Sequence, residues 1–589
     1  MSDNSKKIES DRQILKDAQE KGGTAVLGAF FKLSGPGWLQ SAITLGGGSL
    51  SGALFLGVLG GYSLLWIQLL AIIMGVVMLS AISYVTLSTG QRPFQQINQH
   101  INPALGWGWL IATALANMIW CMPQFSLCYA ALEKNLLKGS IGDSLNEKLM
   151  VSACFLVAAG IAVVMNSRQG LAAKVFDYFL KGLIGVIVLC FFGVVVFMTF
   201  DADNPLKWGE ILAGFIPNLS TWNNPTEEMQ LLIANAPSDF QAYWTKAVVD
   251  LKQNVMIASA ATAVGINMTF LLPYSMLARG WDKPFRGLAR FDLSTGMAIP
   301  YILVTSCVVI ASASQFHNMT PDASLLSNDP TENAKSDVYE KAYAVYSKRI
   351  QEEVGEQEFK TLSIKSEDEK YAPALAQKIA ELSDVEKQIG LSLVKRDTSQ
   401  LASSLTPLLG EKNANIIFGI GICGMGFSTI IILMLINGYV FTEMLGAKPG
   451  GAMHVTGCLI AGVSGAAWPF LWSGDSQIWL SIIASSFGMM LLPIAYITFA
   501  LMMNSKKILG ENKPTGLSMI IWNVLMIASV IVASIWAGTA FYGKVMTNEL
   551  PVQIGLITIL VVYVILVIAG FVLKKSQPKI ADAEAVDAE

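Results

Sequence analysis

The sequence predicts an all-α membrane protein with about 12 transmembrane helices. Of its 589 residues, 53% are hydrophobic and only 14% are charged, whereas charged residues make up about 25% of an average soluble chain. Runs of about 20 mainly apolar residues recur along the chain, and each is long enough to cross a hydrocarbon core of about 30 Å. A single soluble core could not bury so many runs.

The apolar runs are bounded by charged residues or by glycine and proline, and they give twelve expected spans. Two of these spans are interrupted. The first contains three consecutive glycines, and the sixth contains a polar patch followed by Pro273. The spans cover residues 34–56, 62–88, 106–133, 149–166, 174–200, 254–279, 295–315, 413–440, 452–471, 477–504, 517–542 and 552–573.

Basic residues in the short loops predict the orientation. With twelve spans, the arginines and lysines between spans six and seven, between spans ten and eleven, and after span twelve all fall on one side. The positive-inside rule makes this side cytoplasmic. We therefore expect an integral plasma (inner) membrane protein with both termini in the cytoplasm. Its parts are a cytoplasmic segment (1–33), helices 1–7 (34–315), an extracytoplasmic helical insertion (316–411), helices 8–12 (412–573) and a cytoplasmic tail (574–589).

The insertion at residues 316–411 is acidic, with a formal net charge of −6. Within it, residues 337–360 and 369–401 carry apolar side chains at a spacing of three to four among charged ones, which predicts an amphipathic helical pair. Two interpretations stay open. The insertion is either a lid that captures substrate or a solvated addition with no direct role in transport, since surface loops tolerate insertions well.

Catalysis is not expected. The chain has only three histidines, His100, His317 and His454, and contains neither an HExxH nor a GxSxG motif. Ser49 is the most suggestive hydroxyl, but no histidine lies deep in a predicted span to activate it. We therefore expect no enzyme activity, no catalytic residue, no metal-ligating residue and no cofactor. The lipid bilayer and a small-molecule substrate are the expected partners, and nucleic acid is not one.

The two interrupted spans predict the position of a substrate site. Each glycine in a helix costs about 0.8–1 kcal/mol relative to alanine, and a break frees backbone groups that lipid cannot satisfy. Transporters built from two inverted repeats place such breaks in helices 1 and 6, around a central site. The alternative is close helix packing through small residues. Because a second polar break, at Gly265 to Thr269, follows five spans after the first, we favour a cavity.

Several segments resemble one family. Residues 35–41 (GPGWLQS) and 61–66 (GYSLLW) resemble the start of Nramp proteins, and residues 289–292 (ARFD) and 507–510 (KILG) are similar to later segments of that family. The resemblance covers most of the membrane part but neither long outer loop. It implies a LeuT-like inverted-repeat fold with broken helices 1 and 6, and proton-coupled uptake of divalent metal ions.

The family's metal-binding motif is missing here. Its Asp-Pro-Gly-Asn in helix one aligns with Gly46, Gly47, Gly48 and Ser49, and its Met-Pro-His in helix six aligns near residues 266–268 (INM). A dehydrated dication would therefore meet only neutral groups in a low-dielectric site, which leaves its charge uncompensated. From these departures the sequence argues against metal transport.

We therefore expect a carrier for a small neutral polar solute, with a hexose such as glucose as the leading candidate, moved by alternating access as a secondary symport. The three glycines are expected to enlarge the site, with Gly47 opening onto the substrate, and span three is expected to add an amide-rich wall, although its amides could instead bond neighbouring helices. The alternatives are a divalent cation (Mg²⁺ or Mn²⁺) transporter and a membrane substrate sensor. The expected binding residues are Thr44, Gly46, Gly47, Gly48, Ser49, Asn117, Trp120, Gln124, Asn267, Met268 and Thr269.

Overall fold

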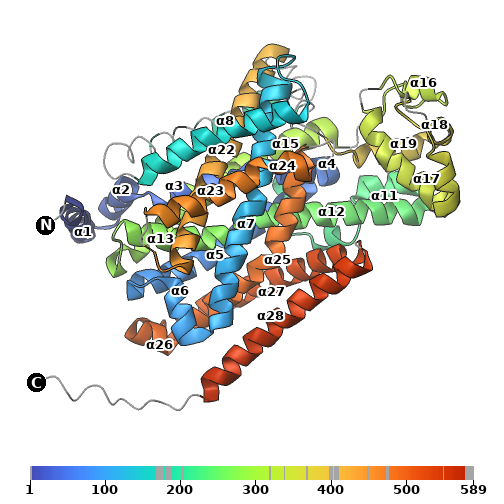
Figure 1. The fold of residues 1–589 in the computed structure, drawn as a ribbon. Coiled ribbons are helices and arrows are strands. Elements are labelled where there is room, and N and C mark those ends of the chain that lie inside the picture. The colour runs from blue at the N-terminus through green and yellow to red at the C-terminus, as the bar shows by residue number, and fades with distance from the viewer. Residues whose placement is uncertain are drawn as a thin grey trace, which may run out of the picture.

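The computed structural model describes most of the chain, and within the described residues every regular element is a helix. Nine helical segments in this part are long and apolar enough to cross a membrane, and two shorter apolar helices accompany them. Figure 1 shows the long helices packed side by side in one bundle. The predicted all-α membrane fold is confirmed. The described residues are 3–167, 178, 182, 185, 188–189, 191–200, 205–317, 320–336, 338–365, 369–396, 402, 410–447, 450–472, 477–547 and 549–576.

Most membrane helices follow the predicted spans, but the helix of span six begins at Gln241, well before the predicted start at residue 254. Only part of the span predicted at 174–200 is among the described residues. The unbroken helices are α5 (Leu65–Thr89), α7 (Pro103–Ala130), α8 (Leu145–Ser167), α15 (Ile299–Phe316), α22 (Glu411–Met444), α23 (Ala452–Ala466), α25 (Gln477–Asn504), α27 (Gly516–Met546) and α28 (Leu550–Ser576).

Local sequence signals explain where these helices begin and end. The side chain of Asn102 accepts a hydrogen bond from the Ala104 amide at 2.8 Å and so caps α7, whose first residue is Pro103. Proline suits this position because its missing N–H would have had no partner in the first turn. Helix α5 ends at Gly90, which has a φ of 65°, a conformation that glycine adopts without steric cost.

Spans one and six are broken, as predicted. The first consists of α3 (Pro36–Thr44) and α4 (Gly47–Gly60), and the sixth consists of α12 (Gln241–Ala263) and α13 (Ile266–Ala278). The residues that precede α4 and α13, Gly46 and Gly265, both have extended backbone. The second break lies at Val264 and Gly265, just before the triplet that aligns with the family motif.

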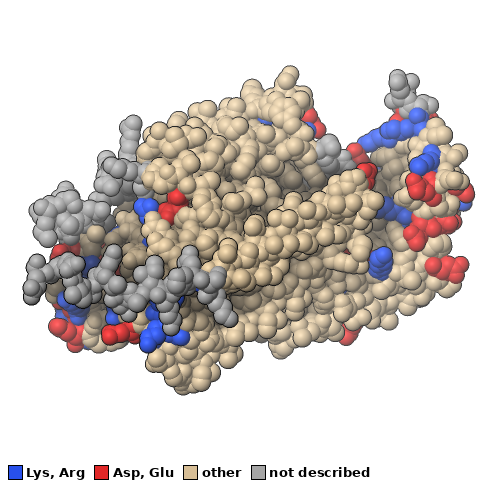
Figure 2. All heavy atoms as spheres, turned by 60° about the horizontal axis from the view of Figure 1, so that its bottom comes forward, with Lys and Arg blue, Asp and Glu red and all other residues tan. Residues whose placement is uncertain are grey.

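Charged side chains gather at the two ends of the molecule, and Figure 2 shows a broad uncharged band between them. Such a band is the surface expected to face lipid. The N-terminal helices α1 (Asp3–Lys21) and α2 (Gly23–Leu33) lie at one end, and the insertion lies at the other (Figure 1). In Figure 1, α26 (Lys506–Leu509) lies toward the end that holds α1, and α11 (Glu227–Ala234) lies beside the insertion. The other short helices are α6 (Pro93–Gln96), α10 (Trp208–Ala213), α14 (Arg286–Leu293) and α24 (Trp468–Leu471).

The insertion is a small helical unit with its own apolar core, which includes Leu325, Tyr346 and Ile379. It contains α16 (Pro330–Asn333), α17 (Tyr339–Leu362), α18 (Pro373–Ala380) and α19 (Asp384–Ser392). The first predicted helix of the pair corresponds to α17, which is interrupted by a kink at Gly355 (φ 78°). The second, expected at 369–401, is instead divided into α18 and α19, because Ser383 and Glu386 form a capping box that starts a new helix.

A buried ion pair fixes the insertion to the end of span six that is remote from the break. Arg349 of α17 donates to Glu386 of α19 at 2.7 Å, and Glu386 also accepts from the indole N–H of Trp244 in α12 at 3.3 Å. The guanidinium of Arg349 lies 3.1 Å from the ring centroid of Phe240, just before α12. The insertion is therefore attached to the half-helix that leads directly to the second break.

Candidate substrate-binding site

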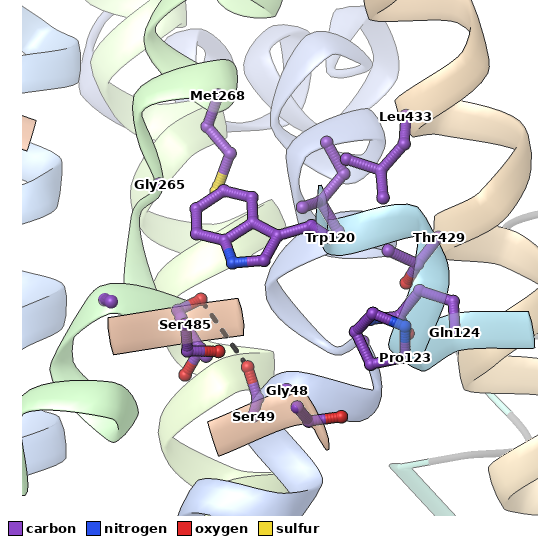
Figure 3. Close-up of a pocket in the computed structure, with 15 residues that line it drawn as sticks. Gly48, Ser49, Trp120, Pro123, Gln124, Gly265, Met268, Thr429, Leu433 and Ser485 are labelled. Atoms are coloured by element: carbon purple, nitrogen blue, oxygen red, sulfur yellow. Dashed lines mark hydrogen bonds between the residues drawn. The ribbon is translucent and has the colours of Figure 1, made fainter. Parts of the chain in front are cut away.

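A cavity lies where the two helix breaks meet (Figure 3). Its volume is about 30 Å³, and a cavity needs about 10–15 Å³ to hold one water molecule. In this conformation it therefore admits an ion or a water-sized group, but not a hexose ring. The lining residues are Ile43, Gly46, Gly48, Ser49, Trp120, Pro123, Gln124, Ala261, Thr262, Gly265, Met268, Thr429, Leu433, Ser481 and Ser485.

The polar groups of the lining are neutral. None of the described residues that line the cavity is Asp, Glu or His. Over the whole described part of the chain, moreover, there is no group of three or more His, Cys, Asp or Glu side chains placed to hold a metal ion. The cavity instead offers hydroxyl groups, the amide of Gln124 and the thioether of Met268. The hydroxyl of Ser481 is buried without a hydrogen-bond partner, so it is available to a bound species.

The first break is held by side chains from neighbouring helices. The side-chain oxygen of Gln124 in α7 accepts from the Gly47 amide at 3.0 Å, which satisfies a free N–H at the start of α4. From α22, the hydroxyl of Thr429 donates to the carbonyl of Ala42 at 3.1 Å. Within the break itself, Ser49 donates to the carbonyl of Thr44.

The second break is closed mainly by its own residues. The side-chain oxygen of Asn267 accepts from the Met268 amide at 2.8 Å, and the hydroxyl of Thr269 donates to the Ile266 carbonyl. Hydroxyl groups of the first broken span contact the second: the hydroxyl of Thr44 lies 3.6 Å from the sulfur of Met268, and the hydroxyl of Ser49 lies 3.5 Å from the carbonyl oxygen of Thr262. Met268 thus lies between the broken helices and lines the cavity.

Neighbouring side chains fill the space next to the three glycines, so the prediction of an enlarged site is wrong. A Cβ built on Gly47 would lie 2.0 Å from Cδ1 of Leu127, and one built on Gly46 would lie 2.6 Å from the hydroxyl oxygen of Thr429. A Cβ on Gly48 would lie 2.9 Å from Cγ2 of Thr262. The glycines therefore allow close helix contact as well as a break, and Gly47 does not open onto the cavity.

The structure brings six of the eleven predicted binding residues to the cavity and places the other five around it. Gly46, Gly48, Ser49, Trp120, Gln124 and Met268 line it, whereas Thr44, Gly47, Asn117, Asn267 and Thr269 do not. Thr269 is instead bonded to the indole N–H of Trp109 at 2.9 Å, and both polar atoms of Asn117 are buried without a partner. Substrate binding by these residues stays a prediction.

Sequence reasoning missed the polar residues that α12, α22 and α25 bring to the cavity: Thr262, Thr429, Ser481 and Ser485. Ser481 and Ser485 are four residues apart, and this spacing puts them on one face of a helix. That signal was present in the sequence, but many serines in membrane helices bond only their own backbone.

The end of α3 remote from the break is held by hydrogen bonds to one carboxylate, that of Asp292 in α14. The carboxylate of Asp292 accepts hydrogen bonds from the Gly35 amide at 3.1 Å, from the Gly37 amide at 2.6 Å and from the hydroxyl of Ser34. An acceptor with negative charge is favourable at a helix N-terminus. Arg92, just before α6, and Glu443 of α22 form an ion pair at 3.0 Å. The Asp292 contacts thus join α3 to α14, and the ion pair joins α22 to α6.

No curated protein matches the chain. Among solved structures, the manganese transporter of Eremococcus coleocola in a histidine-to-alanine variant matches with a TM-score of 0.59 and 13% identity, over 94% of this chain and 96% of that one. The same transporter in complex with an aromatic bis-isothiourea substituted compound gives the same values. At this identity, the likeness shows the fold.

A family model extends the likeness to the sequence. The model of natural resistance-associated macrophage protein-like (Nramp) proteins matches residues 37–328 and 388–540. The matched ranges include both helix breaks, all the residues that line the cavity, and the helices α7, α22 and α25. The gap between them falls on the insertion. The chain therefore belongs to the Nramp family of membrane transporters.

Proposed function

We propose that this protein carries a divalent metal cation, Mg²⁺ or Mn²⁺, across the membrane by alternating access. The observation that carries the proposal is a small cavity, lined by neutral oxygens and one thioether, at the junction of both helix breaks of an Nramp chain. A dehydrated or partly hydrated ion matches this cavity in size. The resemblance to the manganese transporter of Eremococcus coleocola agrees with such a cargo.

The expectation of sugar symport, and of a neutral small-molecule substrate as partner, is wrong. Family membership and the manganese-transporting structural neighbours point to a metal ion. The physical error was to take missing side-chain volume at Gly46 to Gly48 for open space. Leu127, Thr262 and Thr429 occupy that volume, so the cavity stays small.

The backbone around the cavity favours a cation. The half-helices α3 and α12 end at the breaks, and the C-terminal end of a helix carries a partial negative charge. The opposing positive ends, at the start of α4 and α13, are partly neutralised. Gln124 accepts from the Gly47 amide, and Asn267 accepts from the Met268 amide. Both amide side chains thus reduce the repulsion that free N–H groups would exert on a metal ion.

The donor set implies weak binding. Mg²⁺ prefers oxygen ligands and retains several of its waters, whereas the Met268 thioether suits softer ions. Without a carboxylate among the lining residues, the charge of the ion is compensated only by dipoles. We expect a dissociation constant on the order of 10⁻⁴ to 10⁻³ M, the range of weak oxygen-ligand sites. Weak binding would suit a carrier that works at high cation concentration.

In this proposal, the end of the molecule that holds α1 and α26 faces the cytoplasm, together with both chain termini, and the protein resides in the plasma (inner) membrane. The positive-inside rule supports this direction. The insertion then faces outward at the end of α12. The protein acts as a carrier without catalysis.

Parallel uptake into proteoliposomes tests the proposal. Purified protein is reconstituted, and uptake of Mg²⁺, Mn²⁺ and radiolabelled glucose is compared with empty vesicles. We expect saturable uptake of at least one of the two cations and background uptake of glucose. Ser481→Ala removes an unpartnered hydroxyl from the cavity and should weaken cation uptake, whereas Ser464→Ala, on α23 outside the cavity lining, should not. Background uptake of both cations would overturn the proposal.

A further inference from the structure

We propose that Trp120 is a size filter, whose indole ring limits the radius of the cation that the cavity accepts. The inference rests on the proposed function and names a residue that determines specificity for it. Figure 3 shows Trp120 among the labelled lining residues, with Met268 and Gly265 nearby. The side chain is almost completely buried, with 8% of its surface exposed.

Two glycines hold the indole in place. A Cβ built on Gly265, at the second break, would lie 2.2 Å from Cη2 of Trp120, and one built on Gly488, in α25, would lie 2.1 Å from Cζ2. Real Cβ atoms do not approach other atoms so closely, because the interior is close-packed. The ring therefore fills a slot that exists only because both neighbouring residues lack a side chain.

A hydrogen bond fixes the orientation of the ring in this slot. The indole N–H donates to the carbonyl of Ala484 at 2.9 Å, and a buried Trp N–H needs such a partner. Ala484 lies beside Ser485, which lines the cavity. Because packing and the hydrogen bond together prevent rotation, the position of the ring is a fixed boundary of the cavity.

The position of the Trp120 ring affects which cations fit the cavity. Ca²⁺ takes 6–8 oxygen ligands at about 2.3–2.6 Å, whereas Mg²⁺ has six at about 2.0–2.1 Å. The indole supplies no oxygen and occupies the space where further waters or ligands would be accommodated. The filter therefore favours the smaller cations, Mg²⁺ and Mn²⁺, over Ca²⁺ and Ba²⁺.

The first test compares uptake ratios. Trp120→Phe and Trp120→Ala are reconstituted, and uptake of Ca²⁺ and Ba²⁺ is measured relative to Mg²⁺. We expect the ratio to rise about tenfold or more for the Ala variant, the range of discrimination set by pocket size, and less for Phe. Trp109→Phe is the matched control, since Trp109 lies on the same helix and bonds Thr269 away from the cavity. Ratios that stay at the wild-type value in both Trp120 variants would overturn the filter.

The second test uses the glycine slot. Gly488→Ala should push the indole into the cavity and reduce Mg²⁺ uptake at least tenfold, because the three atoms nearest to a Cβ at this position all belong to Trp120. Combining it with Trp120→Phe should restore uptake, because the smaller ring makes room for the added methyl group. If the combined variant is no better than Gly488→Ala alone, although both insert and remain monodisperse, the glycine acts on the packing of α25 and not through Trp120.

A third measurement separates the filter from the proposed function. Ser481→Cys places a thiol in the cavity, and its modification by a small and a large methanethiosulfonate reagent is measured relative to the parent protein. With Trp120 present, neither reagent should react, because the cavity holds only about 30 Å³; with Trp120→Ala, the small reagent should react. If wild-type protein transports no divalent cation but this pattern holds, the proposed function fails and the filter stands. Equal reaction of the small reagent with and without Trp120 contradicts the filter.

Discussion

The two helix breaks have similar backbone conformations but are stabilised differently. The first is held by Gln124 of α7 and Thr429 of α22, which bond its backbone from outside. The second is held by Asn267 and Thr269, which bond their own helix, and by the ring of Trp120 against Gly265. The first break is thus a junction in which two neighbouring helices bond its backbone, whereas the second depends on local capping, on the ring of Trp120 and on the Trp109 indole, which donates to the Thr269 side chain. Changes at the first should therefore affect folding more strongly.

The largest effect is expected for Gly47→Leu. The new side chain would collide with Leu127, since even a Cβ would lie 2.0 Å from its Cδ1 and 2.9 Å from Oε1 of Gln124. Overpacking of this kind costs about 1–3 kcal/mol and occasionally more, and here the Gln124 hydrogen bond is lost as well. We expect aggregation or a clearly lower midpoint of thermal unfolding, measured by size-exclusion chromatography after heating.

A matched control for this variant is Gly160→Leu in α8. A Cβ at Gly160 meets no atom within 4 Å, so the substitution should leave the elution profile unchanged. A stable, monodisperse Gly47→Leu protein would show that the first break is as adaptable as the second.

The next largest effect is expected when a substitution introduces a carboxylate at the first break. Gly46→Asp alone should fold poorly, because a Cβ there lies 2.6 Å from the Thr429 hydroxyl oxygen and 2.9 Å from the Ile43 carbonyl oxygen. Thr429→Ala removes the first of these contacts, and the second requires a small shift of the Ile43 carbonyl within the break. The double variant should bind Mn²⁺ about 100-fold more tightly than wild type, since a full charge close to the ion contributes several kcal/mol at an effective dielectric constant of about 20. Calorimetry on both proteins measures the change, and an unchanged dissociation constant would place the ion elsewhere.

A smaller effect is expected for Gln124→Leu. This variant keeps much of the side-chain volume but leaves the Gly47 amide buried without its acceptor, at a cost of about 1–3 kcal/mol. Hydrogen exchange at the start of α4 should become faster, while exchange in α27 should not change. Gln124→Glu, which keeps an acceptor oxygen, should restore protection of that amide; if it does not, the hydrogen bond is not what holds the break.

Asn267→Ala should have the smallest effect. Its side-chain oxygen accepts from the Met268 amide, but its side-chain nitrogen already lacks a partner. The variant loses one hydrogen bond worth about 0.5–1.5 kcal/mol, which corresponds to roughly a three- to tenfold weaker cation affinity, measured by uptake at several concentrations. Asn254→Ala on α12, whose side chain is exposed to solvent and bonds the Asp250 carbonyl, is the control. If Asn267→Ala weakens cation affinity more than Gln124→Leu does in the same uptake assay, the second break is the more sensitive one.

The site was only partly predictable from the sequence. Trp120 and Gln124 are four residues apart on one predicted helix, and both line the cavity. Asn117 continues the same helical face but does not reach it, because a helical face is wider than the cavity it borders. Thr429, Ser481 and Ser485 come from spans far along the chain, and no local pattern connects them to the first break.

The sequence by itself determined the membrane fold, the approximate place of most spans and the position of both breaks. These features follow from local composition: apolar length sets a span, and Gly46 to Gly48 or the polar patch at Gly265 to Thr269 interrupts it. Only the tertiary structure decided the size of the site. Glycine removes a side chain from one helix, but whether a void or a neighbour takes its place depends on which side chains face it. Here Leu127 and Thr429 fill the space beside two of the glycines, and Trp120 fills the slot between Gly265 and Gly488, so that only a small cavity remains.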